Sequence, residues 1–464
     1  MASAEQKVKV VEHCEISPPP GSVPPTSLPL TFFDIPWLLF SPSQPLFFYE
    51  LPHVSTTHFT TIILPNLKHS LSLTLQRFFP LAGNLTTPLH PTKPHLVYTE
   101  GDSISLTVAE STGDYFNHLT GHYPRHVRDF HHLVPQLEPP TVSSDPHTHP
   151  TLAIQITVFP NCGICIGFTF LNVLGDGRTF NNFLKSWASI FRLGIDSDLP
   201  VLNQFYDRSV ISDPNGLEPI FLEEWWSLRT SQKEFMDTSR MGLKDMVRAT
   251  FVMGPTHMEK LKQWIRTRSK KIFGSPDLHL TPYIITCAFV WACLTKARGI
   301  DNKEVCEELH YFGFIAGGIT RLDYPVPTNY FGNCVAFGRP VTKRNELLGE
   351  DGIVFAAKSI GETTKKLDGD VLGGGKSWIS DGKVLLGSEL HVTVTGSPKV
   401  DLYELDFGWG RPRKIEEISI DRSRAVSLTE SRDVEGGIEI GLALSKPKMD
   451  AFASLFANSF NDLL

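Results

Sequence analysis

The sequence predicts an α/β fold made of two domains of similar size, and three observations support this prediction. The chain has 464 residues, which is too long for one ordinary domain and long enough for two. Apolar runs of strand length alternate with helical patterns in both halves, as they do in α/β proteins. A loop-rich stretch, residues 196–240, is interpreted as the interdomain crossover between domains 1–195 and 241–464.

The N-terminal half opens with an alternating stretch at residues 5–16, which predicts a first strand. Three prolines at 18–20 follow and exclude a helix there. A helix is predicted from Leu64 to Phe79 because its apolar side chains fall on one face. The elements predicted after it are strands at 95–99 and 103–108, a hairpin of strands at 151–158 and 163–171, and a helix at 180–191.

The C-terminal half is predicted to open with a strand at 246–253 and two helices at 258–268 and 282–297. Apolar runs of strand length then recur along the chain. They cover residues 309–316, 384–386, 390–395, 401–405, 416–420 and 438–444, and a final helix is predicted over 448–463.

Composition excludes several classes of function. The net charge is −7, so no overall basic field favours nucleic acid, and an anionic ligand would need a local basic patch. The seven cysteines are an odd number in a large chain, which predicts free thiols in a reducing compartment. No apolar window approaches the ~20 residues of a membrane span, and the histidines lack metal-ligand spacing. We expect a cytoplasmic monomer with no metal, membrane or nucleic-acid partner.

A first motif follows the second strand of the predicted hairpin. The apolar run 168–171 ends at Asn172, and Asp176, Gly177 and Arg178 follow before the next helix. Taken alone, Asn172 and the Asp-Gly pair are typical turn residues. Because a strand, a turn and a helix in this order present side chains at a crevice, we expect a functional site here.

Two further motifs lie in the C-terminal half. One is the run of residues 406–410, whose two glycines suit a tight turn around aromatic side chains; it consists of Asp406, Phe407, Gly408, Trp409 and Gly410. The other is the stretch 329–334, Asn-Tyr-Phe-Gly-Asn-Cys. A local basic patch comes before both motifs in the sequence. It spans twelve residues and consists of Lys260, Lys262, Arg266, Arg268, Lys270 and Lys271.

Together these motifs resemble those of the plant BAHD acyltransferases, which transfer acyl groups from coenzyme A. The run 406–410 is identical to that family's second signature, and the turn at 172–177 is similar to its first, His-x-x-x-Asp-Gly. The stretches 28–41, 329–334, 394–399 and 425–442 resemble the branch of malonyltransferases that act on flavonoid and phenolic glucosides. The resemblance therefore spans nearly the whole chain.

This resemblance implies a fold of the chloramphenicol-acetyltransferase-like type, with a tunnel between its two domains and Asn172 at the centre. It also implies malonyl-CoA, or another acyl-CoA, as co-substrate with no permanently bound cofactor. The implied reaction is malonyl transfer to a sugar hydroxyl of a glycosylated phenolic acceptor.

The resemblance assigns roles to single residues. Asp176 is structural and is expected to pair with Arg321, and the run 406–410 is structural too. Arg178 could contact a carboxylate on the acyl group, because a guanidinium can donate two parallel hydrogen bonds to the two oxygens of a carboxylate. The remaining coenzyme A and acyl contacts are expected from Lys260, Lys262, Arg266, Arg268, Ser397 and Trp378.

Asn172 departs from the family at its most important position. The family's general base is the histidine of the first signature, and a carboxamide cannot take up a proton as an imidazole can. Three explanations stay open: an engineered replacement, a natural member with lost or altered activity, or another base such as His391. The otherwise intact first motif favours an engineered replacement. A second departure, Gly317 and Ile319 in place of the family's Asp-x-Arg, favours natural divergence and weakens the expected Asp176–Arg321 pair.

Two functions follow from these patterns. The first is an acyl-CoA-dependent O-acyltransferase whose activity Asn172 impairs or alters. The alternative is a catalytically silent protein of the same fold that binds acyl-CoA or a glucoside without turnover.

Overall fold

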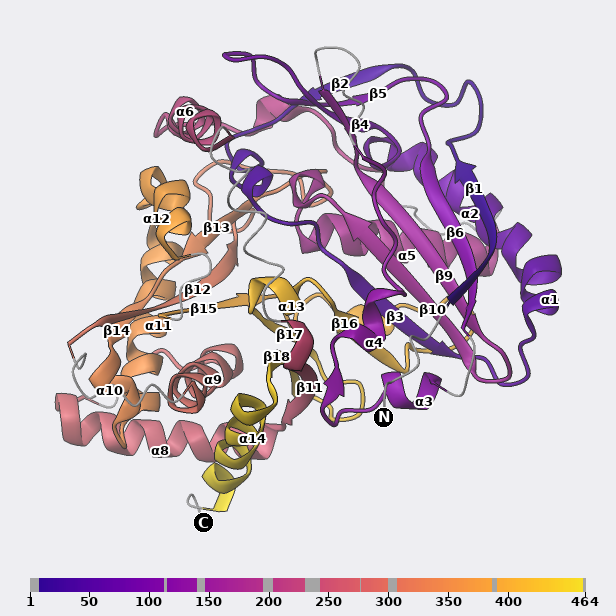
Figure 1. The fold of residues 1–464 in the computed structure, drawn as a ribbon. Helices are drawn as coiled ribbons and strands as arrows, with labels where there is room; N and C mark the ends of the chain where they lie inside the picture. Colours follow the sequence, from indigo (N-terminus) through magenta and orange to yellow (C-terminus); the bar gives the residue numbers. More distant parts are fainter. Residues whose placement is uncertain are drawn as a thin grey trace.

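The structure of the protein, a computed structural model, is an α/β fold with two large sheets (Figure 1). It describes residues 8–111, 115–139, 147–194, 203–229, 243–275, 277–298, 307–385 and 390–461. Both ends of the predicted 196–240 crossover and the last residues of the predicted final helix lie outside these ranges. The proposed domain boundaries stay predictions.

The first large sheet has six strands, formed mostly by the N-terminal half. In spatial order they are β1 (Val8–Ile16), β6 (Ile104–Ser111), β9 (Leu152–Phe159), β10 (Gly163–Phe170), β3 (Pro45–Glu50) and β16 (Lys414–Glu417). The helices α2 (Leu64–Arg77) and α5 (Gly177–Leu193) pack together behind this sheet (Figure 1). All eight residues of β10 are buried, so this strand offers a rigid base for the turn at its end.

The second large sheet belongs mostly to the C-terminal half. Its strands are, in spatial order, β13 (Val335–Gly338), β12 (Leu309–Gly317), β15 (His391–Thr395), β17 (Val426–Glu430), β18 (Ile438–Ser445), β11 (Met246–Met253) and β7 (Arg125–His126), with β14 (Val341–Lys343) pairing with β12. The helix α9 (Pro282–Ala297) is buried over almost its whole length. The helices packed against it are α8 (Pro255–Phe273), α10 (Arg344–Leu348), α11 (Gly352–Gly369) and α14 (Lys446–Asn461).

Smaller elements complete the molecule. A four-stranded sheet contains, in spatial order, β2 (Thr26–Pro29), β5 (His95–Tyr98), β4 (Asn84–Thr87) and β8 (His147–Pro150). Two helices on the opposite side of Figure 1 from α1 pack together, α6 (Leu217–Arg229) and α12 (Trp378–Leu385). The other short helices are α1 (Thr56–His58), α3 (Phe116–Leu119), α4 (Arg128–His131) and α13 (Ile420–Ser423).

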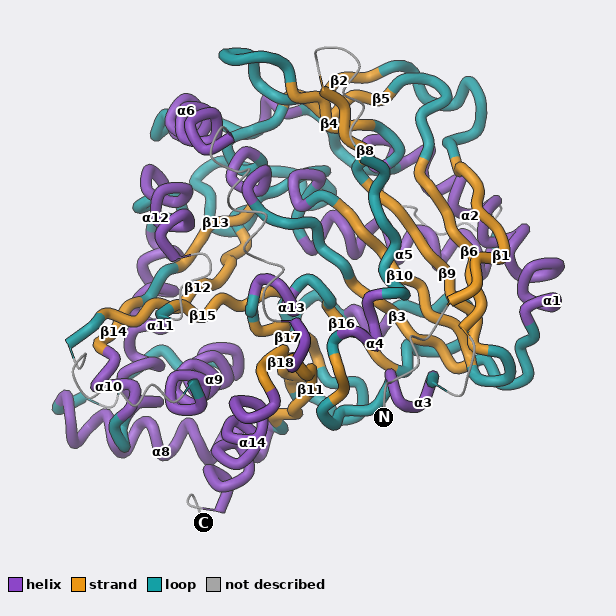
Figure 2. The backbone as a smooth tube through the Cα atoms, viewed as in Figure 1, coloured by secondary structure: helices purple, strands orange, loops and turns teal. Residues whose placement is uncertain are grey.

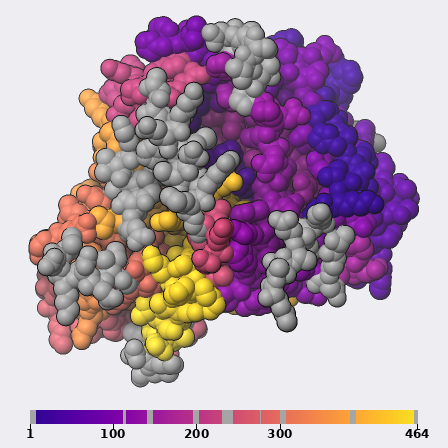
Figure 3. Space-filling view, viewed as in Figure 1, coloured from indigo at the N-terminus to yellow at the C-terminus, as the bar shows by residue number. Residues whose placement is uncertain are grey.

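Each half of the chain lends one strand to the other half's sheet. β16 pairs antiparallel with β3 from Lys414 opposite Phe48 to Glu417 opposite Pro45, and Figure 2 shows these two strands side by side. In return, β7 pairs antiparallel with β11, with His126 opposite Val247. The two halves are therefore joined by backbone hydrogen bonds as well as by the chain connection. Figure 3 shows the surface recessed where the purple N-terminal half meets the pink and yellow parts.

Several sequence predictions are confirmed. The hairpin forms from β9 and β10 with Gly163 opposite Phe159, and β11 and α9 have the predicted bounds. Other predictions are wrong. Residues 402–404 form a 3₁₀ turn instead of a strand, because Asp401 before them is left-handed with φ of 53°. The strand predicted at 416–420 ends at Glu417, and residues 384 and 385 belong to α12. Within the described residues, no helix is long and apolar enough to cross a membrane.

Candidate functional site

The first motif lies in a short 3₁₀ turn, Asn172–Leu174, between the end of β10 and the start of α5. The side chain of Asn172 is fixed there by two hydrogen bonds to the segment 41–43. Its Oδ1 accepts from Ser43 Oγ at 2.6 Å, and its Nδ2 donates to Ser41 O at 2.7 Å. Both ends of the carboxamide are thus engaged. Since a carboxamide does not titrate, position 172 can orient a hydroxyl group but cannot deprotonate it.

Asp176 begins α5 and holds a second segment of chain against it. Its Oδ1 accepts from Thr179 N at 3.1 Å, so it is a helix N-cap. Its Oδ2 accepts from Cys334 N at 3.2 Å and lies 3.5 Å from Arg178 Nη2. The predicted pairing with Arg321 is wrong: Arg321 Nε donates to Asp368 Oδ1 at 2.8 Å. Arg178, two residues along the same turn, takes the place that the sequence analysis gave to Arg321.

Arg178 itself is anchored by the backbone of the third motif. Its Nη1 donates to Thr328 O at 2.9 Å and to Tyr330 O at 2.7 Å. The guanidinium therefore joins α5 to the stretch 329–334. The predicted contact of Arg178 with an acyl carboxylate stays a prediction.

Sequence analysis missed the buried polar group beneath the turn. Asn333 donates both from its backbone N and from its Nδ2 to Asp34 Oδ1, each at 3.1 Å, and its Nδ2 also lies 3.1 Å from Asn172 O. Arg208 Nη1 lies 3.6 Å from Asp34 Oδ2. The stretches 28–41 and 329–334 both resemble the family, but nothing in the sequence indicates that Asp34 and Asn333 meet.

Gly332 allows this close approach. A Cβ atom at this position would lie 2.2 Å from Arg208 Nη1, and the φ of 137° is disfavoured for other residues. The neighbouring thiol of Cys334 is no nucleophile at neutral pH, because burial, with Asp176 adding to it, raises its pKa to about 12.

Ser397 lies in a turn beside the start of α5. Its Oγ accepts from Lys399 N at 3.2 Å, and Val400 O accepts from Asn181 Nδ2 at 2.7 Å. The structure thus brings the turn 397–400 to the same helix end that Asp176 caps. The predicted contact of Ser397 with coenzyme A stays a prediction.

The 406–410 turn braces the other end of α5. Asp406 Oδ1 accepts from the backbone N of Gly408 at 2.6 Å and of Gly410 at 2.9 Å, and both glycines have positive φ. Asp406 also lies 3.6 Å from Arg192, sixteen residues after Asp176. At 1.5 Å per helical residue this contact lies about 24 Å from the N-cap. Phe407 is buried against Tyr49, Trp187 and Phe191.

Trp378 belongs to an aromatic group near the segment that holds Asn172. Its ring packs on Phe221 and on Phe337, at 5.9 and 5.4 Å between centroids. Phe337 in turn packs on Trp37 and on Phe40, and Phe40 directly precedes Ser41. The rings of Trp37, Phe40, Phe337 and Trp378 are only half-buried. They therefore form a partly open aromatic wall.

The basic patch lies on α8, which runs along the lower edge of the view in Figure 1. Lys262 and Arg266 are four residues apart and share one face of this helix. Lys262 lines a cavity of about 220 Å³ together with Pro255, Met258, Glu259, Leu280, Pro282, Ile285 and Gly436. Arg268 is engaged elsewhere, in ion pairs with Asp351 and Glu350. The four predicted phosphate contacts therefore do not form one cluster.

The fold is that of the two-domain, coenzyme-A-dependent acyltransferases. Vinorine synthase has the same fold, with a TM-score of 0.65 and 16% identity over 96% of both chains. So has F. sporotrichioides TRI101 complexed with coenzyme A and T-2, with a TM-score of 0.65 and 14% identity over 92% of this chain and 97% of that one.

The chain belongs to the transferase family, the family of the BAHD acyltransferases, whose model matches residues 6–458. It is 40% identical to phenolic glucoside malonyltransferase 1 of Nicotiana tabacum, over 98% of this chain and 99% of that protein. It is 39% identical to coumaroyl-CoA:anthocyanidin 3-O-glucoside-6''-O-coumaroyltransferase 1 of Arabidopsis thaliana, over 98% of both. It is also 39% identical to malonyl-coenzyme A:anthocyanin 3-O-glucoside-6''-O-malonyltransferase of Dahlia pinnata, over 96% of both.

Proposed function

We propose that the protein is an acyl-CoA-dependent O-acyltransferase that transfers a malonyl group from malonyl-CoA to a sugar hydroxyl of a flavonoid or phenolic glucoside. Full-length relatives at about 40% identity carry names with this donor and these acceptors. Relatives of similar identity are named for coumaroyl-CoA, so the choice of malonyl-CoA as donor needs a test of its own.

The observation that carries the proposal is the position of Asn172 at the end of the buried central strand. The attacking hydroxyl must lose its proton, and a positioned base contributes roughly 10²–10⁴-fold to such a step. Asn172, held by Ser43 and Ser41, can only orient the hydroxyl. The hydroxyl oxygen would attack the thioester carbonyl while its proton passes to solvent, the C–S bond would break, and the coenzyme A thiolate would take up a proton from solvent and leave as the thiol. We infer that this transfer is slow in the present chain.

The aromatic wall near Ser41 supports a phenolic acceptor. Flat aromatic rings stack well on partly open aromatic side chains such as Trp37 and Trp378. The basic face of α8, with Lys262 and Arg266, supports binding of the coenzyme A phosphates.

One observation favours a second candidate, a binding protein without turnover. The carboxamide of Asn172 is held at both ends, by one hydrogen bond at Oδ1 and one at Nδ2. The remaining N–H and lone pair could hold a substrate hydroxyl in place, but neither can take its proton.

One experiment separates the two candidates. Thiol release from malonyl-CoA is measured with a phenolic glucoside, for the present chain and for Asn172→His, and is repeated with coumaroyl-CoA. We expect the histidine variant to be at least ~10²-fold faster. Equal rates would contradict the role of position 172. If neither protein releases thiol while both bind malonyl-CoA, the binding function is supported instead.

A further inference from the structure

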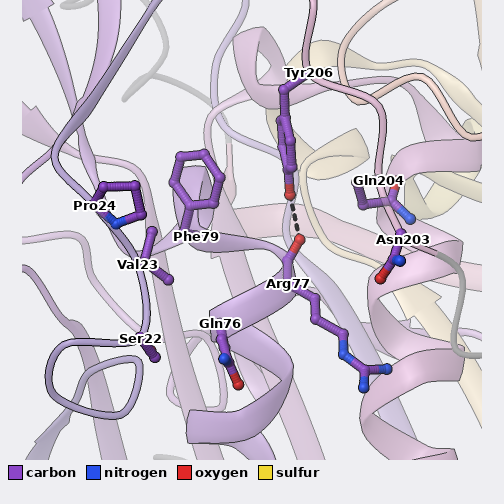
Figure 4. Close-up of a pocket in the computed structure, with 9 residues that line it drawn as sticks. All are labelled: Ser22, Val23, Pro24, Gln76, Arg77, Phe79, Asn203, Gln204 and Tyr206. Atoms are coloured by element: carbon purple, nitrogen blue, oxygen red, sulfur yellow. Dashed lines mark hydrogen bonds between the residues drawn. The ribbon is translucent and has the colours of Figure 1, made fainter.

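Outside the site described above, a cavity of about 370 Å³ lies beside the end of α2 (Figure 4). Its lining includes the charged side chain of Arg77 and the rings of Phe79 and Tyr206. Figure 4 shows the guanidinium of Arg77 apart from both rings, so these groups do not converge on one ligand. A group of side chains that does converge lies elsewhere, at the edge of the six-stranded sheet.

His13, Glu15 and Glu138 form a cluster of potential metal ligands at this edge. His13 and Glu15 are two residues apart on β1, so both side chains project from the same face of the sheet. Glu138 comes from the chain that follows α4. Each side chain offers one ligand atom, and all three atoms lie within 4.8 Å of one another. The expectation of no metal rested on the spacing of the histidines, and spacing cannot reveal a group that the fold assembles.

Hydroxyl groups in β6 and just before it orient two of the three ligands. Thr107 lies opposite His13, and its Oγ1 is 3.1 Å from His13 Nδ1. With the proton on Nδ1, this nitrogen donates to Thr107, and Nε2 presents a lone pair toward Glu15. Ser103 Oγ donates to Glu15 Oε2 at 2.9 Å, and the other oxygen, Oε1, lies 3.7 Å from His13 Nε2. Histidines and carboxylates that ligate metals are typically held by further partners in this way.

Both the distances and the charges in this cluster fit a divalent cation. A tetrahedral zinc ion with bonds of about 2.0–2.2 Å places its ligand atoms about 3.4 Å apart. The 3.7 Å between His13 and Glu15 is close to this value, and their side chains are 54% and 49% exposed, so small rotations can close the remaining gaps. Among the residues that the structure describes, no lysine or arginine pairs with Glu15 or Glu138. A bound cation would compensate two carboxylates that otherwise repel each other.

We propose that His13, Glu15 and Glu138 bind a zinc ion, with water as its fourth ligand. One imidazole nitrogen and two carboxylate oxygens are zinc ligands, whereas calcium takes six to eight oxygen ligands. In the sheet, β6 and β9 separate β1 from β10, so the site lies three strand spacings, roughly 14 Å, from the strand that ends at the first motif. Bound zinc ties the segment after α4 to the edge strand. The inference does not depend on the proposed transferase function.

The test is a zinc titration of the full chain in competition with a chromophoric chelator. We expect the parent protein to bind zinc at this site with a Kd on the order of 10 µM. His13→Gln and Glu138→Gln should each weaken binding at least ~10-fold, since losing a partner that merely orients a ligand already costs roughly 10–100-fold. Glu12→Gln is the matched control, because Glu12 lies on the same strand, projects from its other face and pairs with Lys68. This control should bind zinc like the parent protein.

A further variant tests the orientation of the imidazole. Thr107→Val keeps all three ligands and the shape of the strand but removes the hydroxyl that contacts His13, and it should weaken zinc binding severalfold. The same titration with calcium should give weaker binding than with zinc, because one ligand is a nitrogen. Absence of zinc binding by the parent protein, equal affinity of the parent, His13→Gln and Glu138→Gln, or tighter binding of calcium than of zinc would overturn the proposal.

Discussion

Arg125 from the N-terminal half and Glu416 from the C-terminal half form an ion pair, with 2.8 Å between Nη2 and Oε1. The two side chains are 0% and 4% exposed. Arg125 lies on β7 and Glu416 on β16, which are the two strands that the halves exchange. Arg248 lies 3.0 Å from the other oxygen of Glu416 and 2.8 Å from Asp421. The exchange of strands thus encloses a buried ionic cluster.

Substituting Glu416 should destabilise the protein strongly. In Glu416→Gln, Arg125 and Arg248 would stay buried with less compensating charge. Breaking a buried pair in this way costs about 3–5 kcal/mol. Urea unfolding should report that loss, while Glu404→Gln, which breaks the exposed pair with Arg411, should cost less than about 1 kcal/mol. Equal effects of the two variants would contradict the role of the cluster.

The same buried ionic cluster predicts that the free energy of unfolding depends on pH. Burial alone would raise the pKa of Glu416, but Arg125, Arg248 and Lys414 lower it from 4.5 to about 2. A carboxyl whose pKa is lower in the folded state stabilises the protein above its unfolded pKa and loses this effect as the pH falls. The difference in unfolding free energy between the parent and Glu416→Gln should therefore be constant above about pH 5.

That difference should shrink between pH 4.5 and 2, by about 2 kcal/mol from pH 6 to pH 3. Urea unfolding of both proteins at pH 6, 4.5 and 3 measures it. Taking the difference cancels titration of other carboxyls, such as Glu417, whose pKa burial raises. A difference that is independent of pH would show that the pKa of Glu416 is the same in the folded and unfolded protein, and would contradict the prediction.

Two substitutions of Asp176 should separate the contribution of its N-cap hydrogen bond to stability from the contribution of its negative charge. Asp176→Ala removes the acceptor for Thr179 N and for Cys334 N, and we expect a loss of about 2 kcal/mol. Asp176→Asn keeps an oxygen acceptor for the helix and should cost about half as much. Arg192→Ala at the exposed far end of the helix is the control, expected within about 0.5 kcal/mol of the parent. Identical losses for Asp176→Ala and Asp176→Asn would mean that the negative charge of Asp176 beside Arg178 matters more than the N-cap hydrogen bond.

The face of α8 that carries Lys262 and Arg266 should bind coenzyme A, if the proposed function is correct. Lys262→Ala and Arg266→Ala should each weaken binding roughly tenfold, the loss of one charge-assisted contact. Lys260, two residues before Lys262, projects from another side of the helix and should matter less. Calorimetry with coenzyme A and with its 3′-dephospho form measures both effects. Equal losses of coenzyme A affinity on substituting Lys260, Lys262 or Arg266 by Ala would show that the positive charge of the helix acts as a whole and that no single face binds the ligand.

Local patterns predicted the elements that carry the site. The apolar run of β10, the polar turn at Asn172 and the helix after it all follow from side-chain periodicity over short distances. The helix α5 begins at Gly177, three residues before the predicted start at 180, because Asp176 caps it. Capping depends on a side-chain hydrogen bond, which a pattern of apolar residues does not reveal.

Contacts between distant segments could not be predicted. The cation beside Asp176 turned out to be Arg178, since position along the sequence does not determine which guanidinium reaches a buried carboxylate. β7 has only two residues and β16 four, which is too short for an alternating pattern. Asp34 and Asn333 are ordinary polar residues in the sequence, and only the fold brings them together beneath Asn172.

The strand β16 has a consequence for how the protein is made. Its residues, Lys414–Glu417, come long after β3 (Pro45–Glu50) in the sequence, yet they complete the sheet of the first half. During synthesis, β3 therefore keeps one unpaired edge until residues 414–417 have left the ribosome. Such edges recruit other strands. Chains truncated before residue 414 should aggregate through β3, and the nascent protein would need this edge protected, for example by a chaperone, until those residues are translated.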